Sequence, residues 1–266
     1  MTTILSIEQL QTQFHTPSGL VTAVKNVSFS LAAGETLALV GESGSGKSIT
    51  AHSILGLLDK SKISHPQGKI LFNGSDLLRL TEKELRNIRG QEICMIFQEP
   101  MTALNPLHQI DKQIIECLDR SLFVTAQARK KRCLELLHKV QIPEAEKRLK
   151  SYPHELSGGQ RQRVMIAMAI ANNPKVLIAD EPTTALDVGV QNEILHLLKQ
   201  LQLQNNMAML LISHDLHMVR HVADHIAVMK DGEVVEKGTA TEIFENPQTD
   251  YCKRLIDAAF ELKDIA

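Results

Sequence analysis

The sequence predicts an α/β protein with a parallel sheet at its core and a helical insertion. Three continuous apolar runs of strand length, residues 36–40, 176–179 and 209–212, are typical of strands buried on both faces of such a sheet. Apolar residues between the second and third runs follow a helical period over 190–201, which predicts a strand–helix–strand crossover. The stretch from about 105 to 173 has no strand pattern, so we expect it to be helical.

The elements before the insertion can be predicted in chain order. Residues 5–10 and 21–31 are expected to be strands, separated by the turn-rich segment 16–19. The run 36–40 is the first strand of the core. Residues 47–58 then carry apolar positions at the spacing of a helix that packs on one side.

The insertion and the segments after it follow. Residues 127–140 predict a helix, and we interpret its basic run, 129–132, as a solvated face rather than a nucleic-acid patch. After the crossover, residues 226–229 and 234–235 are expected to be short strands, joined by a hairpin turn at Asp231-Gly232.

Composition excludes some classes of protein. The chain has 266 residues, of which 43% are hydrophobic and 23% charged, so it is not a wholly disordered chain. Lys and Arg number 29 against 31 Asp and Glu, which gives a net charge of −2. A chain without excess positive charge is a poor candidate for general nucleic-acid binding or for a polybasic membrane anchor.

Cellular location can be inferred from apolar runs and cysteines. The longest uncharged apolar run, Val164–Ala171, is far shorter than the roughly 20 residues of a membrane helix, and no secretory signal pattern is present at the N-terminus. The cysteines, at positions 94, 117, 133 and 252, are too widely spaced for a metal knuckle. We expect reduced thiols without chemistry in an intracellular chain.

Residues 41–48, Gly-Glu-Ser-Gly-Ser-Gly-Lys-Ser, match the phosphate-loop pattern G-x-x-x-x-G-K-[ST] in full. The glycines let backbone N–H groups surround phosphate oxygens, and the following helix contributes its N-terminal dipole. Lys47 would bind the β and γ phosphates, and the Ser48 hydroxyl would ligate Mg²⁺. Ile49 breaks the competing dinucleotide pattern. The expected ATP contacts are Gly41, Glu42, Ser43, Gly44, Ser45, Gly46, Lys47, Ser48 and Ile49.

A second buried strand ends in two acidic residues, Asp180 and Glu181. The turn at the end of a strand allows both carboxylates to approach one ligand. We expect Asp180 to be a partner of Mg²⁺ and Glu181 to orient or deprotonate the attacking water.

A second glycine-rich turn occurs at Leu156-Ser157-Gly158-Gly159-Gln160. Ser157 is a good N-cap, and an apolar helical pattern follows, so the turn predicts a second phosphate-binding helix start. Because one nucleotide hardly needs two such sites from one subunit, a neighbouring subunit is expected to complete the pocket. With this stretch the sequence resembles the ATP-binding cassette (ABC) family, whose signature is LSGGQ. The resemblance extends from the first strand to about residue 250.

The resemblance implies a P-loop NTPase core with an N-terminal antiparallel β subdomain. It assigns residues 1–104 and 174–250 to this ATP-binding core, 105–173 to a helical signature subdomain, and 251–266 to a C-terminal helix.

The resemblance also implies residue roles. Two cassettes would pair head to tail, so that ATP lies between the phosphate loop of one and Ser157, Gly158, Gly159 and Gln160 of the other. Gln98 corresponds to a glutamine that senses Mg²⁺ or the water. His214 corresponds to a histidine that contacts the γ-phosphate. Asp187, in the loop 185–187, would report across the interface. The implied catalytic residues are Glu181, His214 and Gln98; the implied Mg²⁺ ligands are Ser48, Gln98 and Asp180; and Phe14 is the candidate for adenine stacking.

Three stretches, 97–106, 152–155 and 246–251, are similar to the dipeptide, oligopeptide and nickel uptake branch of that family. Residues 105–108 and the pairing of 164–169 with 180–187 look closest to the first half of fused peptide-uptake ATPases. The implied function is an ATPase at the cytoplasmic face of the membrane that energises import of peptides. Its implied partners are a second cassette, separate membrane permease subunits docked around Gln98 to Ile115 and, indirectly, a solute-binding protein outside the membrane, with no nucleic acid.

Alternatives stay open. They are a nickel importer, a soluble cassette acting on nucleic acid or ribosome, and a nucleotide-binding regulator that does not hydrolyse. The solute, the identity of the paired cassette, and whether this is a short subunit or half of a longer protein are also open at this point.

Overall fold

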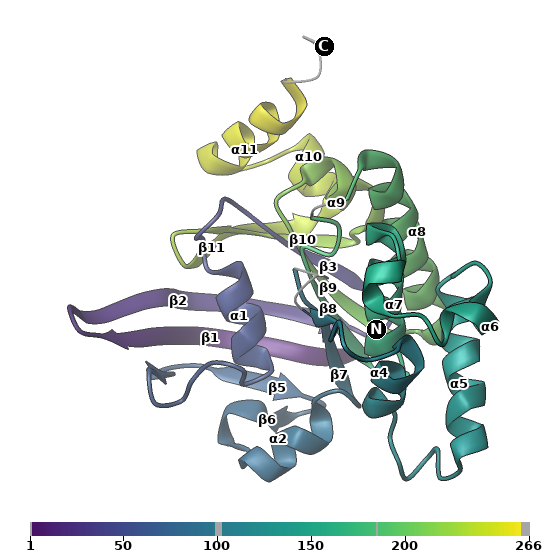
Figure 1. Cartoon of the computed structure of the whole chain (residues 1–266). Coiled ribbons are helices and arrows are strands. Elements are labelled where there is room, and N and C mark those ends of the chain that lie inside the picture. The colour runs from purple at the N-terminus through teal and green to yellow at the C-terminus, as the bar shows by residue number, and fades with distance from the viewer. Residues whose placement is uncertain (1, 99–102, 185, 262–266) are drawn as a thin grey trace.

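The computed structural model describes residues 2–98, 103–184 and 186–261 and contains, within them, two sheets and the helices that cover them (Figure 1). The core sheet has the strand order β11-β10-β3-β9-β8-β7. Its strands are β3 (Thr36–Val40), β7 (Ile93–Ile96), β8 (Val176–Asp180), β9 (Ala208–Ser213), β10 (His225–Lys230) and β11 (Glu233–Thr239). All neighbours in this sheet are parallel except β10 and β11. The predicted α/β class with a parallel core is therefore confirmed.

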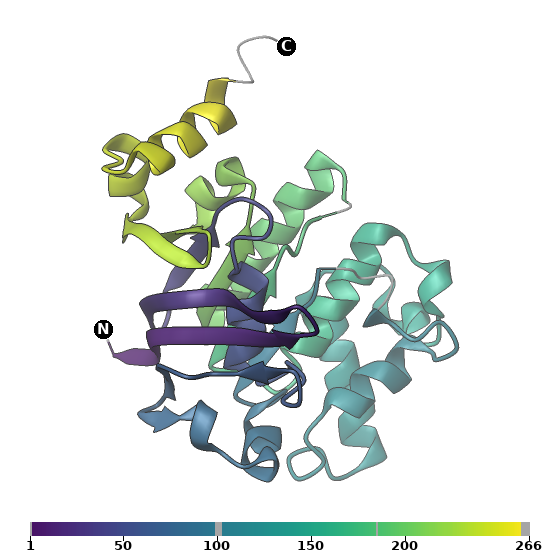
Figure 2. The ribbon, with the colours of Figure 1, turned by 90° about the vertical axis from the view of Figure 1, so that its left-hand side faces the viewer.

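The second sheet is antiparallel and built mainly from the N-terminal part of the chain. Its strands are β1 (Thr3–Thr16), β2 (Gly19–Ala32), β4 (Ile63–Ser64), β5 (Lys69–Phe72) and β6 (Ser75–Asp76). Figure 2 shows β1 and β2 as a long hairpin across the front of the molecule. Both strands are longer than the predicted runs, because backbone pairing continues beyond the alternating residues up to the pair Thr16 and Gly19. The predicted antiparallel N-terminal part is confirmed.

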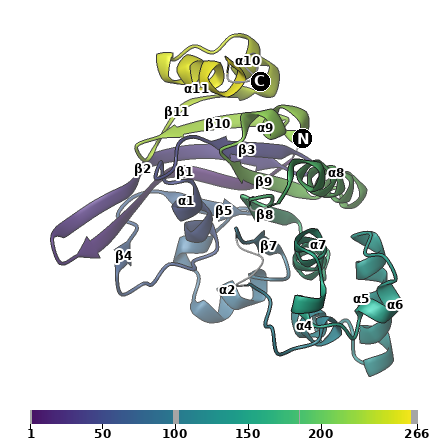
Figure 3. The ribbon, with the colours of Figure 1, turned by 45° about the horizontal axis from the view of Figure 1, so that its top comes forward.

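Helices surround the core sheet, and the helical region between β7 and β8 forms a separate group (Figure 3). The α-helices are α1 (Lys47–Ile54), α2 (Glu82–Ile88), α4 (Ile110–Cys117), α5 (Ala126–Lys139), α6 (Ala145–Arg148), α7 (Gly158–Ala169), α8 (Val188–Asn205), α9 (Leu216–Val222), α10 (Ala240–Glu245) and α11 (Asp250–Glu261), with short 3₁₀ turns at Leu77–Arg79 and Pro153–Glu155. Within the described residues, 103–173 contain helices and turns and no strand, so the predicted helical insertion is also confirmed.

The central strand β3 shows how the core is built. Its five residues are all buried, and alternate side chains enter different clusters because strand side chains alternate between faces. Leu39 packs in the cluster that contains α1 and the antiparallel sheet, whereas Val40 packs in the cluster that contains α9 and α11. A third cluster unites α4 to α8 with the opposite end of the sheet.

Two local expectations were wrong in part. The first helix ends at Ile54 rather than near residue 58, because Gly56 adopts a left-handed φ of 58° and turns the chain. The basic run on α5 is not a uniformly solvated face. Arg132 is buried, and its guanidinium donates to the carbonyl of Ala171 at 2.9 and 3.1 Å. This arginine therefore ties α5 to the end of α7 instead of facing solvent.

Candidate nucleotide-binding site

The loop between β3 and α1, residues 41–46, is shaped by its glycines. Gly41 has a φ of 148°, and a Cβ there would lie 2.1 Å from the carbonyl oxygen of Met229. Gly46 is left-handed, with a φ of 101°, and forms the N-cap of α1 without any side-chain cap among the described residues. The N–H groups at the start of α1 are thus not capped by a side chain, which is the arrangement that binds anions at a helix N-terminus.

Lys47 is folded back over this loop. Its ammonium donates to the carbonyls of Gly41 and Glu42, at 2.8 Å each, and to the Ser45 hydroxyl at 3.3 Å. Burial lowers the pKa of Lys47, and the carboxylates of Glu181, Asp180 and Glu42 oppose that shift. The residue is therefore a buried cation held by hydrogen bonds inside the loop, where it can meet phosphate charge.

Ser48 and Asp180 meet although they are 132 residues apart in the sequence. The Ser48 hydroxyl, in the first turn of α1, donates to Asp180 Oδ1 at the end of β8 over 3.1 Å. Burial is the main cause of the raised pKa of Asp180, and the hydrogen bond from Ser48 opposes it. A hydroxyl and a carboxylate side by side are the hard oxygen donors that Mg²⁺ prefers, so these residues fit a magnesium ion.

Glu181 collects the other predicted catalytic side chains. Its Oε2 accepts hydrogen bonds from Gln98 Nε2 at 2.8 Å and from the Thr184 hydroxyl at 2.9 Å. Its Oε1 lies 3.0 Å from His214 Nδ1. Burial would raise the pKa of Glu181, but the bonds from His214 and Thr184, together with the charge of Lys47, hold it below its ordinary value. The carboxylate is therefore ionised at neutral pH.

The backbone at Glu181 is left-handed, with a φ of 46°, which is uncommon for a residue with a side chain. Its N–H donates to the carbonyl of Ile212 on β9 at 2.9 Å. This conformation turns the chain away from β8, so that Asp180 and Glu181 both approach the end of the sheet. Thr184 was missed by the sequence reasoning, because a threonine near an acidic pair carries no signal of its own.

The glycine-rich turn at the start of α7 is exposed and closes on itself. The Ser157 hydroxyl accepts from the N–H of Gln160 at 3.2 Å, and the Gln160 side chain accepts from the N–H of Ser157 at 3.1 Å. This reciprocal pair is a capping box. Within the described residues, no hydrogen bond joins this turn to Lys47, Asp180 or Glu181. The structure does not bring the two predicted phosphate-binding turns together within one chain.

Asp187 lies close to that turn. It is the N-cap of α8 and accepts from the N–H of Val190 at 3.0 Å. A Cβ at Gly159 would lie 2.7 Å from the side chain of Val190, so the start of α7 packs against the start of α8. Of the expected loop 185–187, residue 185 lies outside the described residues.

Phe14, the candidate for adenine stacking, lies near the outer end of β1, where its backbone pairs with Val21 and Ile63. It is half-buried. Within the described part of the chain, no hydrogen bond or ring contact links it to the loop 41–46, so its role stays a prediction.

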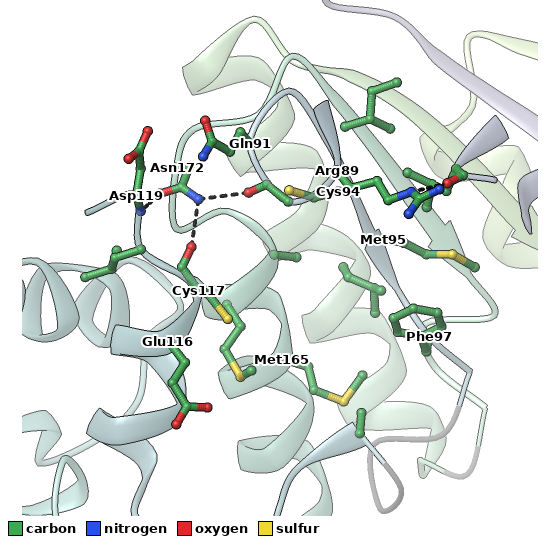
Figure 4. Close-up of a pocket in the computed structure, with 18 of the residues that line it drawn as sticks. Arg89, Gln91, Cys94, Met95, Phe97, Glu116, Cys117, Asp119, Met165 and Asn172 are labelled. Carbon is green, nitrogen blue, oxygen red and sulfur yellow. Dashed lines mark hydrogen bonds between the residues drawn. The ribbon is translucent and has the colours of Figure 1, made fainter. Parts of the chain in front are cut away.

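A pocket of about 540 Å³ opens between the core sheet and the helical group (Figure 4). It is lined by β7 with Phe97 beyond it, by the end of α4 and by methionines of α7. Asn172 braces its rim, donating at 2.8 Å to the carbonyls of Gly90 and of Cys117. Phe97 is 44% exposed at this pocket, although aromatic side chains are usually covered. The segment 99–102, which falls within the predicted permease-docking stretch, lies outside the described residues.

The fold and this constellation define a P-loop nucleotide-binding protein. The ABC transporter family matches residues 24–184, more than half of the chain, and the chain belongs to that family. This confirms the resemblance to the ABC family that was inferred from the sequence.

Similar proteins and solved structures point to the same family. The chain is 58% identical to the peptidoglycan transport ATP-binding protein YejF of Agrobacterium fabrum, covering 96% of this chain and 47% of that one. It is 52% identical to the oligopeptide transport ATP-binding protein OppD of Bacillus subtilis, covering 94% and 70%. The chain thus spans about half of the first relative. The dimeric structure of MJ0796, a bacterial ABC transporter cassette, superimposes with a TM-score of 0.77 at 30% identity, covering 89% of this chain and 99% of that one.

Cys94, Cys133 and Cys252 are buried and Cys117 is half-buried, and all are free thiols. Burial raises the pKa of Cys94 to about 12 and of Cys117 to about 11, so neither is a ready nucleophile. Among the described helices, none combines the length and hydropathy needed to cross a bilayer.

Proposed function

We propose that this chain hydrolyses ATP to ADP and phosphate and thereby energises import of peptides through separate membrane permease subunits. The observation that carries the hydrolytic part is the position of Glu181. It lies beside Asp180 at the end of β8 and is held by Gln98, Thr184 and His214. The peptide part is supported by relatives whose names describe oligopeptide and dipeptide transport.

The residues of the loop would bind ATP in stated ways. The N–H groups of residues 41–49 would surround the phosphates, and the Lys47 ammonium would exchange its bonds to Gly41 and Glu42 for phosphate oxygens. Magnesium, when bound, neutralises phosphate charge. Ser48, Asp180 and Gln98 are the residues that would hold it.

Glu181 would take the proton from the attacking water. Because its pKa is held below the ordinary value, the carboxylate is available as a proton acceptor at neutral pH. Gln98 and Thr184 both donate to Oε2 and thereby fix the orientation of the carboxyl group. His214, on the other oxygen, is exposed, with 61% of its side chain accessible, and would turn toward the γ-phosphate when nucleotide is present.

A second cassette would complete the site. Ser157, Gly158, Gly159 and Gln160 of the partner copy would contact the γ-phosphate, and Asp187 would lie at the interface. This part of the proposal is supported by the exposed, self-capped state of the turn and by the dimeric structure of the similar cassette MJ0796. The partner cassette is a second copy of this chain or a paired one. Phe14 would stack on adenine.

The permease would dock at the pocket between the core and the helical group. That surface presents exposed Phe97 and an apolar lining from β7 and α7, which suits a short helix from a membrane subunit. The chain would then lie peripherally at the cytoplasmic face of the membrane. A solute-binding protein outside the membrane would select the peptide.

The test is Glu181→Gln, measured in the purified chain with Mg-ATP. Loss of the general base is expected to lower turnover by about 10²–10⁴-fold while ATP binding, followed by calorimetry, is retained. Glu8→Gln, at an exposed position on β1, is the matched control and should leave turnover unchanged. Full turnover in Glu181→Gln would remove Glu181 from its role. The importer assignment is tested by adding the permease subunits with the peptide-loaded solute-binding protein, or RNA or DNA instead. The assignment predicts that turnover rises with the former and not with RNA or DNA.

A further inference from the structure

The outer side of the P-loop, residues 41–48, is held by the turn between β10 and β11. Gly232 donates its N–H to the carbonyl of Ser45 at 3.0 Å, and its own carbonyl accepts from Lys25 at 2.8 Å. These bonds fix the C-terminal half of the loop. Residues 42–44, by contrast, are exposed.

One side chain from the far end of the sequence reaches that exposed half. Tyr251, in the first turn of α11, accepts a hydrogen bond at its hydroxyl oxygen from the N–H of Glu42 over 3.4 Å, at the long end of the range. The ammonium of Lys230 lies 5.0 Å from the centre of the Tyr251 ring, a cation–π distance. Tyr251 thus contacts both the P-loop and the end of β10.

The hydroxyl keeps its proton at neutral pH. Burial raises the pKa of Tyr251 above its already high ordinary value. The hydrogen bond from the N–H of Glu42 opposes this rise, and the nearby charges of Glu42 and Asp231 add to it. A neutral phenol can accept from a backbone N–H while its own O–H remains available as a donor.

The helix that carries Tyr251 is anchored at its start by Glu236 on β11. The Glu236 carboxylate accepts from the N–H groups of Gln248 and Thr249, at 2.7 and 2.9 Å, and from the Thr249 hydroxyl at 2.6 Å. Cys252, next to Tyr251, is fully buried. The start of α11 is therefore not free to swing away from the sheet.

The other end of α11 is anchored on α9. The carbonyl oxygen of Ala259 lies 2.9 Å from His217 Nε2. The rings of Phe260 and His217 pack edge to face, with their centroids 4.3 Å apart. Because α9 begins at Leu216, just after His214, α11 connects the P-loop with the helix that follows that histidine.

We propose that Tyr251 is a positioning residue for ATP, which holds the N–H of Glu42 and with it the exposed half of the P-loop in the conformation that receives phosphate. The proposal rests on ATP binding at this loop, as proposed above. Without this contact the loop would sample other conformations. The apparent Kd for ATP would then rise, because it equals the intrinsic Kd divided by the fraction of molecules whose loop is in the binding-competent conformation.

The test is Tyr251→Phe in the full chain, which keeps the ring over Lys230 and removes only the hydroxyl. Loss of one neutral hydrogen bond is expected to raise the Kd and the KM for ATP about 3–10-fold. The kcat should stay within about twofold, because the contact is made equally before and during the reaction. Tyr152→Phe, at the only other tyrosine, is the matched control and should change neither value.

A merely structural role would lower the melting temperature and the amount of active protein without selectively changing KM. We expect the melting temperature without nucleotide to be unchanged and its rise on adding ATP to be smaller in Tyr251→Phe. Unchanged Kd and KM, or a fall in kcat at constant KM, would overturn the proposal and leave the proposed function standing. Absence of ATP binding in the unaltered chain would instead overturn the proposed function itself.

Discussion

The chain has two glycine-rich turns that begin helices, and they differ in what surrounds them. The turn before α1 is held by its own chain on one side, since Lys47 bonds into it and Gly41 lies against the carbonyl of Met229. The turn before α7 is exposed and capped only by its own Ser157 and Gln160. The first is a site assembled by one chain. The second is an open surface, which is consistent with the proposal that a partner cassette completes the site there.

The difference also explains the glycines. At Gly41 the backbone is left-handed and a side chain would collide with main chain, so glycine is required by the fold. At Gly158 a Cβ would make an ordinary 3.5 Å contact with Leu186, so the fold does not require glycine there. Under the proposed function, glycine at Gly158 would allow close approach of a ligand.

The largest difference between variants in the two turns is expected in the affinity for ATP. Lys47→Ala removes the buried cation, and the Kd for ATP in the single chain should rise by at least about 100-fold, the scale of a lost charge-assisted contact to phosphate. Ser157→Arg should leave the single-chain Kd unchanged. Calorimetry on both, with exposed Lys131→Ala as control, checks this. Equal loss in Ser157→Arg would break the comparison.

A smaller effect is expected on stability. Gly41→Ala should lower the free energy of unfolding by about 1–3 kcal/mol, because its Cβ meets a backbone oxygen that cannot move easily. Gly158→Ala should be neutral or raise it by up to about 1 kcal/mol, since alanine favours helix over glycine. Urea unfolding of both variants measures the difference. A destabilised Gly158→Ala would show that both turns are fixed by packing.

The smallest effect is expected from the cap of α7. Ser157→Ala should lower the free energy of unfolding by about 1 kcal/mol, the usual value of an N-cap serine. Thr239→Ala removes the same kind of capping box from α10 and should cost about as much. Only Ser157→Ala should also weaken ATP-dependent pairing in sedimentation. An equal loss of pairing in Thr239→Ala would mean that general stability, and not the turn itself, is responsible.

The parallel core and the phosphate loop were predictable because their signals are local. An apolar run of five residues followed by glycines and a lysine fixes strand, loop and helix start within residues 36–48. The approach of Ser48 to Asp180 was also predictable, since carboxyl ends of parallel strands meet at one edge of a sheet.

Other parts could not be predicted because their causes are distant in sequence. Tyr251 is separated from Glu42 by 209 residues, and Gly232 contacts Ser45 only through the path of the β10–β11 turn. The basic run on α5 concealed Arg132, whose carbonyl partner, Ala171, lies in the turn that follows α7. The early end of α1 depends on a single left-handed glycine.

A mixing experiment tests most directly whether one nucleotide is bound by turns from two chains. Lys47→Ala and Ser157→Arg are each placed in the Glu181→Gln background, and sedimentation velocity is measured with Mg-ATP. Each variant alone should stay monomeric, because both nucleotide sites of its dimer would be damaged. The equimolar mixture should form dimers, because one of the two nucleotide sites in the mixed dimer combines the intact loop of the Ser157→Arg chain with the intact turn of the Lys47→Ala chain. A mixture that stays monomeric, while Glu181→Gln alone dimerises, would contradict the account.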